Sequence, residues 1–148
     1  MNNHIQVIAR AVIIDDGHIL LTCSTNGSKR YTYLPGGHVE LGEPSKVALL
    51  RELTEELGVT DANITRLLGT HESLWHDSTN TLQHEINIIF ATDVPGFSRH
   101  ETPASQEAHI SFVWAPLDQL ADANLLPVIM RTRLAALLAG PAIEIITD

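Results

Sequence analysis

Hydrophobic and polar residues alternate along several stretches of the chain, which is the pattern of half-buried β-strands. Turn-forming residues separate some of these stretches. Asp15-Asp16-Gly17 follows the first one, and the polar residues 77–80 interrupt a long apolar region, so a hairpin is expected at both places. The pattern therefore predicts a protein rich in strands, at residues 4–14, 18–24, 30–34, 63–76, 81–92 and 110–114.

Helical spacing replaces this alternation in residues 44–57. Apolar side chains recur there at intervals of three and four residues, and we expect the stripe to face the core: Val47, Leu50, Leu53 and Leu57. Pro44 suits the start of a helix, and Gly58 suits its C-terminal end. The Leu- and Ala-rich residues 125–139 predict a second main helix, and residues 117–122 predict a short one.

Three carboxylates share one face of the helix predicted at 44–57. Glu52, Glu55 and Glu56 occupy positions i, i+3 and i+4. Like charges at this spacing cost roughly 0.2–0.5 kcal/mol per pair unless a cation lies among them. Oxygen ligands grouped on a rigid element are what Mg²⁺ or Mn²⁺ binds, with a substrate phosphate often completing the coordination. The face is therefore interpreted as a divalent-metal site.

The segment before this helix is rich in glycine. Tyr33-Leu34-Pro35-Gly36-Gly37 indicates a strand that runs into a tight turn, where glycine lets the backbone approach a ligand. Together, the segments predict a loop, a helix with acids on one side and apolar residues on the other, and a second loop.

These residues match a known sequence motif. Gly37, Glu43 and the run Arg51-Glu52-Leu53-Thr54-Glu55-Glu56-Leu57-Gly58-Val59 reproduce the Nudix box, G-x5-E-x7-R-E-U-x-E-E-x-G-U, where U is a bulky aliphatic residue. The chain thus resembles the Nudix hydrolases. The resemblance implies an α/β fold, an α/β/α sandwich with a mixed β-sheet between helices. We expect residues 1–148 to form a single domain, with 141–148 as a loose tail.

The same resemblance implies the chemistry. A metal-dependent pyrophosphohydrolase would cleave a diphosphate linkage in a nucleoside diphosphate derivative or a nucleotide, by water attack on phosphorus. The expected Mg²⁺ or Mn²⁺ ligands are the Gly37 carbonyl and the carboxylates of Glu52, Glu55 and Glu56. Arg51 corresponds to an arginine that orients the carboxylates.

Two residues are candidates for the general base, the group that accepts a proton from the attacking water. Glu52 lies in the box. Glu107 lies in a loop before a late strand, as the base does in other members of the family. The sequence favours Glu52 slightly, because the box fixes its position.

Four further residues are candidate substrate contacts. His38 follows the glycine turn and can approach phosphates. Tyr33 alternates with Tyr31 on one strand. Trp75 can stack on a base or sugar, and Glu85 can contact a phosphate or a metal. Each also has an ordinary structural explanation, since a tryptophan in an amphipathic strand usually packs in a core.

Composition limits the partners. The net charge is −9 and no basic stripe is present, which argues against a nucleic-acid polymer and favours a small phosphorylated substrate. No apolar run approaches the roughly 20 residues of a membrane span. Cys23 is the single cysteine, which suits a reducing cytoplasm. A homodimer is compatible with these observations.

Two other functions are known for proteins of this fold. A non-catalytic Nudix-fold sensor that binds a nucleotide usually loses box residues or carries a DNA-binding domain, and this chain shows neither change. A prenyl diphosphate isomerase of the same fold needs a catalytic cysteine in its own motif, and Cys23 lies in no such motif.

Overall fold

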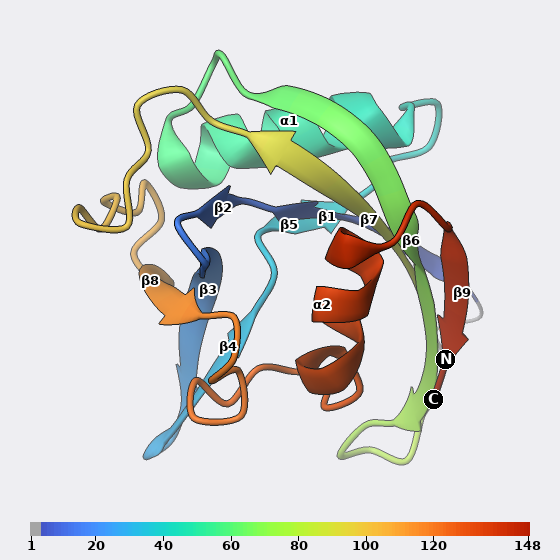
Figure 1. The fold of residues 1–148 in the computed structure, drawn as a ribbon. Helices are drawn as coiled ribbons and strands as arrows, with labels where there is room; N and C mark the ends of the chain where they lie inside the picture. The colour runs from blue at the N-terminus through green and yellow to red at the C-terminus, as the bar shows by residue number, and fades with distance from the viewer. Residues whose placement is uncertain (1–3) are drawn as a thin grey trace.

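A mixed five-stranded sheet forms the centre of the structure, a computed structural model that describes residues 4–148 (Figure 1). Its strand order is β5-β1-β7-β6-β9. The β1/β7 and β6/β9 pairs are parallel, whereas β1/β5 and β6/β7 are antiparallel. The bounds are Gln6–Val12 for β1, Gly36–His38 for β5, Asn63–His76 for β6, Leu82–Asp93 for β7 and Glu144–Thr147 for β9.

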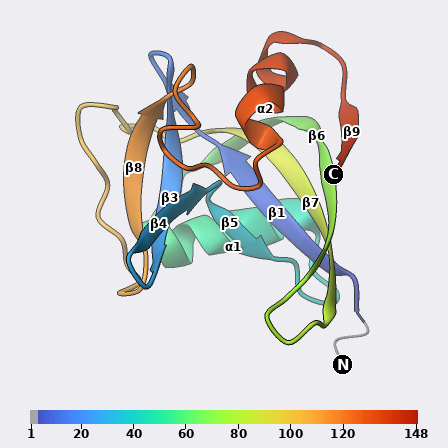
Figure 2. The same cartoon turned by 90° about the horizontal axis from the view of Figure 1, so that it is seen from below.

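A smaller antiparallel sheet stands beside it (Figure 2). It comprises β2 (Ile14–Asp15), β3 (His18–Asn26), β4 (Lys29–Tyr33) and β8 (Ser111–Pro116). The strand expected over 4–14 is therefore two strands, β1 and β2, which belong to different sheets. The chain changes sheet at Ile13, whose carbonyl accepts a hydrogen bond from the Leu20 amide at 3.0 Å.

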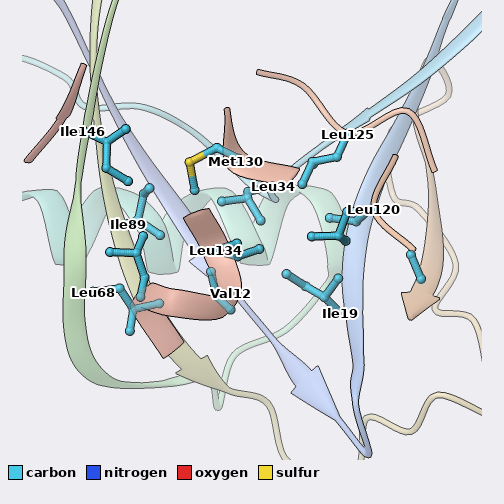
Figure 3. Packing of buried hydrophobic residues seen from close by; sticks show 13 residues of the cluster. Val12, Ile19, Leu34, Leu68, Ile89, Leu120, Leu125, Met130, Leu134 and Ile146 are labelled. Carbon is cyan, nitrogen blue, oxygen red and sulfur yellow. The ribbon is translucent and has the colours of Figure 1, made fainter. Parts of the chain in front are cut away.

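Two helices cover opposite faces of the five-stranded sheet (Figure 1). On one face, α1 (Ser45–Leu57) packs Leu49 and Leu53 against Ala9 and Ala11 of β1. On the other, α2 (Met130–Ala139) fills the space between the two sheets, where its apolar side chains meet those of β1, β3, β6 and β7 (Figure 3). The expected α/β/α arrangement is confirmed. Within residues 4–148, neither helix is long and apolar enough to cross a membrane.

The buried stripe of α1 differs from the expected one. Val47 is 52% exposed and Leu50 38%, whereas the buried positions are Ala48, Leu49, Leu53, Glu56 and Leu57. The helix is rotated so that an i, i+4 row at 49, 53 and 57 meets the sheet, which also carries Glu56 inward. The end at Gly58 is as expected, because Gly58 has φ 69° and its amide donates to the Thr54 carbonyl.

Two helix predictions for the C-terminal third are wrong. Residues 117–122 form turns, and α2 begins at Met130 rather than at residue 125. Residues 125 and 126 instead lie along β4, where the Leu126 amide donates to the Thr32 carbonyl at 2.9 Å. Leu126 precedes Pro127, a position that disfavours helical backbone.

The expected loose tail is an ordered strand. β9 pairs in parallel with β6, and Asp148 accepts hydrogen bonds at 2.7 Å from Nε2 of His71 and at 2.6 Å from the Ser73 hydroxyl. Arg133 of α2 also pairs with Glu144. The hydrogen bonds to the buried His71 and Ser73 and the ion pair with Arg133 hold this segment. The polar residues of the segment did not indicate these contacts.

The rotation of α1 predicts unequal effects of two leucine substitutions. Leu53→Ala should lower the free energy of unfolding by about 2–5 kcal/mol, because it leaves a cavity in the core. Leu50→Ala, at a 38% exposed position of the same helix, should cost well under half as much. Urea denaturation of the two variants and the wild type measures the difference, and equal losses would contradict this packing.

Candidate functional site

The acidic helix packs against the glycine turn. A Cβ atom at Gly37 would lie 2.3 Å from the carboxyl carbon of Glu52 and 2.5 Å from both of its oxygens. At Gly36, where φ is +135°, it would lie 1.9 Å from the Ala9 carbonyl oxygen. At Gly36 only glycine fits, because a side chain would collide with the backbone of β1; at Gly37 a side chain would displace the Glu52 carboxylate. The turn and the helix thereby bring the Gly37 backbone beside Glu52.

Glu56 is a carboxylate in the protein interior. The residue is 6% exposed, and its Oε2 atom has no hydrogen-bond partner in the described part of the chain. Burial, and after it the charge of Glu52, raise the pKa of Glu56 to about 8, whereas the charge of Arg10 acts in the opposite direction. A buried oxygen without a partner is costly, so this position fits an atom that the protein chain does not supply.

Arg51 connects the acids of the helix and of the preceding loop. Its Nε and Nη2 atoms donate to the two carboxylate oxygens of Glu43 at 2.8 and 3.0 Å. Nη1 donates to Glu52 at 3.0 Å and lies 3.4 Å from Glu55, and Nη2 also reaches the His38 carbonyl at 3.0 Å. The hydrogen bond to Glu43 is the largest cause that raises the pKa of Arg51. The guanidinium thus contacts three carboxylates and the end of β5.

Glu55 lies further from the interior than its neighbours. Its side chain is 49% exposed and is directed at Arg51. Among residues 4–148, no three His, Cys, Asp or Glu side chains lie close enough together to hold a metal ion. The donors are nevertheless of the type that a hard divalent cation prefers, and a cation beside Glu52 and Glu56 would offset their repulsion. The residues therefore fit such an ion.

Glu107, the second candidate base, lies near the same carboxylates. The Gln106 amide donates to the Glu56 carbonyl at 2.8 Å, which attaches this loop to the end of α1. The Glu107 side chain is 33% exposed, and its Oε2 atom lies 3.4 Å from Nε2 of His109. Its charge also raises the pKa of Glu56. Glu52 and Glu107 thus both remain candidates.

A cavity of about 570 Å³ opens on the other face of the sheet, the one that α2 covers. Tyr33, Trp75 and Glu85 contribute to its wall, as does Tyr31. Trp75 is 45% exposed, so it is not a core residue. His38 does not line the cavity; its side chain is exposed, and its Nε2 lies 2.8 Å from the Gln6 carbonyl oxygen Oε1. The roles of these residues toward a substrate stay predictions.

Arg10 is a residue that sequence reasoning missed. It lies on β1, donates from Nε to Asn87 Oδ1 at 3.1 Å and from Nη1 to the Leu34 carbonyl at 3.0 Å, and places its guanidinium 5.5 Å from the centre of the Tyr33 ring. Burial lowers its pKa, and the charge of Glu85 opposes this effect most strongly. One signal was available, because Arg10 interrupts an otherwise apolar strand.

Comparison with known proteins agrees with this architecture. The protein named ADP-ribose pyrophosphatase from Methanocaldococcus jannaschii is 36% identical over 94 residues, which make up 63% of this chain and 53% of that protein. The chain therefore spans about half the length of this relative.

Solved structures extend the comparison to the whole fold. The E. coli ORF135 protein superposes with a TM-score of 0.66 and 28% identity, over 93% of this chain and 94% of that one. The NUDIX hydrolase from Nitrosomonas europaea gives a TM-score of 0.71 at 23% identity, over 93% and 90%, which supports the fold alone. The family model described as the NUDIX domain matches residues 4–136, and the chain therefore belongs to the NUDIX family.

Proposed function

We propose that the chain is a metal-dependent pyrophosphohydrolase. It would cleave a diphosphate linkage in a nucleoside diphosphate derivative or a nucleotide by water attack on phosphorus. The observation that carries the proposal is the buried Glu56 carboxylate, which has an oxygen without a partner and lies near a second carboxylate, Glu52. Such a pair suits a bound cation and is unfavourable without one.

The ligands we propose for the ion, Mg²⁺ or Mn²⁺, are the Gly37 carbonyl and the carboxylates of Glu52, Glu55 and Glu56. Glu55 would take part by leaving its 3.4 Å contact with Arg51. When bound, a divalent ion neutralises phosphate oxygens and lowers the pKa of water. Nudix hydrolases generally use divalent metal ions, in agreement with this assignment.

The protein's own groups position the reaction. Arg51 holds Glu52 through the 3.0 Å hydrogen bond, so that this carboxylate keeps one orientation beside Gly37. Glu52 or Glu107 accepts the proton from water, and the cavity holds the part of the substrate beyond the phosphates. We retain as predictions a single domain over 1–148, a cytoplasmic location and a homodimer.

The relatives support this proposal in general terms. The relative from M. jannaschii is named for a substrate with a diphosphate linkage, as the proposal requires. We infer from this name only the class of bond.

The first test is Glu56→Gln. This variant should fold, because the amide keeps the shape of the side chain and resembles the protonated carboxyl that the raised pKa favours. It should lower kcat by about 10²-fold or more, since a group that stabilises charge at the reacting centre is lost. Turnover is measured on a panel of nucleotides with Mg²⁺ and with Mn²⁺. Glu101→Gln, in an exposed loop, is the control, and near-normal turnover of Glu56→Gln at saturating metal would contradict the proposal.

A second test identifies the base. Glu52→Gln and Glu107→Gln are compared over pH, and the variant that lacks the base should lose the acidic limb of the kcat profile along with most of its activity. We expect this result for Glu52→Gln. Glu107→Gln should keep the limb and show weaker binding of metal or substrate. The reverse result would assign the base to Glu107, and an unchanged limb in both variants would exclude both residues.

Glu56 also predicts a pH dependence of stability in the absence of metal. Its pKa in the folded state is about 8, against an ordinary value of 4.5, so the folded state binds the extra proton between these two values. The free energy of unfolding should therefore fall as pH rises through this window. Urea denaturation in a chelator measures the slope, which Glu56→Gln should reduce. Added Mg²⁺ or Mn²⁺ should restore stability near pH 8, and an identical slope in wild type and variant would contradict this account.

A further inference from the structure

We propose that Glu85 and Asn87 form hydrogen bonds with the edge of a nucleobase in the cavity, and that they select a guanine-type nucleobase. This inference rests on the proposed function, because it names the substrate class of the same site. A guanine-type edge presents two N–H donors beside one carbonyl oxygen. The two side chains on β7 offer the complementary groups.

The strand places both side chains on the cavity wall. Glu85 and Asn87 are two residues apart on β7, so they project from the same face of the sheet. They lie opposite Ser73 and His71 of β6, and all four residues line the cavity. This part of the wall is therefore polar, in a cavity that is otherwise mainly aromatic and aliphatic.

Asn87 has a fixed orientation. It is 8% exposed, and its Oδ1 accepts the hydrogen bond from Arg10 Nε at 3.1 Å. Because arginine can only donate, the amide must present its oxygen to Arg10 and its NH₂ group elsewhere. No residue between 4 and 148 accepts a hydrogen bond from this NH₂ group. Asn87 therefore offers the cavity a donor.

Glu85 offers acceptors. Across residues 4–148 its carboxylate takes part in no hydrogen bond or ion pair, although its charge opposes the lowering of the Arg10 pKa. Carboxylate oxygens that are partly removed from water are stabilised by N–H donors. Along β7 the wall thus presents two acceptor oxygens, followed by one donor.

This order suits guanine better than the other bases. Guanine offers N2–H and N1–H to the two oxygens of Glu85, and O6 to the amide of Asn87. Adenine and cytosine each present only one N–H donor group on this edge, which leaves one carboxylate oxygen without a partner. Uracil has carbonyl oxygens on both sides of its single N–H, so one of them would face the carboxylate.

The remaining wall suits an aromatic ring. Tyr31 and Tyr33 stand with their ring centres 6.1 Å apart, and Trp75 lines the cavity from β6. Aromatic side chains stack on any base and add no selectivity. A volume of about 570 Å³ is in the range of small-molecule sites. The selectivity is therefore assigned to Glu85 and Asn87.

The experiment measures binding without hydrolysis. Isothermal titration calorimetry in a chelator, with GMP, IMP, AMP and CMP, reports base preference independently of metal and turnover. GMP should bind at least about tenfold more tightly than AMP or CMP, since a hydrogen bond to a charged group is worth about that factor. IMP, which lacks the 2-amino group, should fall between them.

Two variants locate the effect. Glu85→Gln should weaken GMP binding about tenfold or more and change AMP binding less than about threefold. Glu72→Gln is the matched control, because Glu72 lies on the neighbouring strand and bonds His84 at 2.7 Å, away from the cavity. It should leave both affinities unchanged. Circular dichroism checks that each variant is folded.

The outcomes separate this inference from the proposed function. Equal or tighter binding of AMP by the wild type overturns the inference, and this comparison needs no variant. A GMP preference that survives in Glu85→Gln overturns it as well. Hydrolysis of nucleotides without base preference would leave the proposed function standing alone. A Glu85-dependent preference for GMP without any hydrolysis would support recognition of the guanine base and contradict the proposed function.

Discussion

Close packing of α1 against the Gly36-Gly37 turn places a carboxylate in the protein interior, and the arrangement of the site depends on this contact. Glycine allows the helix to approach until Glu52 touches the backbone of the turn. Glu56 then lies inside, next to another acid, with a raised pKa. Arg51 restrains Glu43 and Glu52 through hydrogen bonds, and the charge of Arg10 opposes the rise in the pKa of Glu56. The repulsion between Glu52 and Glu56 and the hydrogen bonds that restrain Glu52 thus arise within the same turn and helix.

The acidic helix covers one face of the five-stranded sheet, and the cavity lies on the other. Arg10 interacts with groups on both sides. Arg10 contacts the ring of Tyr33 and the amide of Asn87 on the cavity side. Its charge also acts on Glu56 beyond the glycine turn. Through this guanidinium the acidic helix and the cavity are coupled electrostatically. The charges of Glu56, on the helix side, and of Glu85, on the cavity side, therefore both interact with the charge of Arg10.

The sequence predicted those features of the fold that interactions between nearby residues determine. The helix bounds near 44 and 57 follow from proline, glycine and spacing, and the long strands β6 and β7 follow from alternation. The exposure of Val47 and Leu50 could not be predicted, because several apolar stripes fit one amphipathic helix and the sheet selects among them. β9 depends on partners in β6 more than 70 residues away. Arg10 likewise acquires its contacts only when β1, β4 and β7 meet.

Alternation along β1 has a consequence for how this protein can change over time. Ala9 and Ala11 face α1, whereas Arg10, between them, faces the cavity. Side chains on a strand switch faces at every residue, so inserting or deleting one residue within β1 would turn Arg10 toward the helix and an alanine toward the cavity. A single insertion or deletion would thus disrupt both the packing of β1 against α1 and its contribution to the cavity. Length variation should thus be confined to loops, while β1 can vary only by substitution.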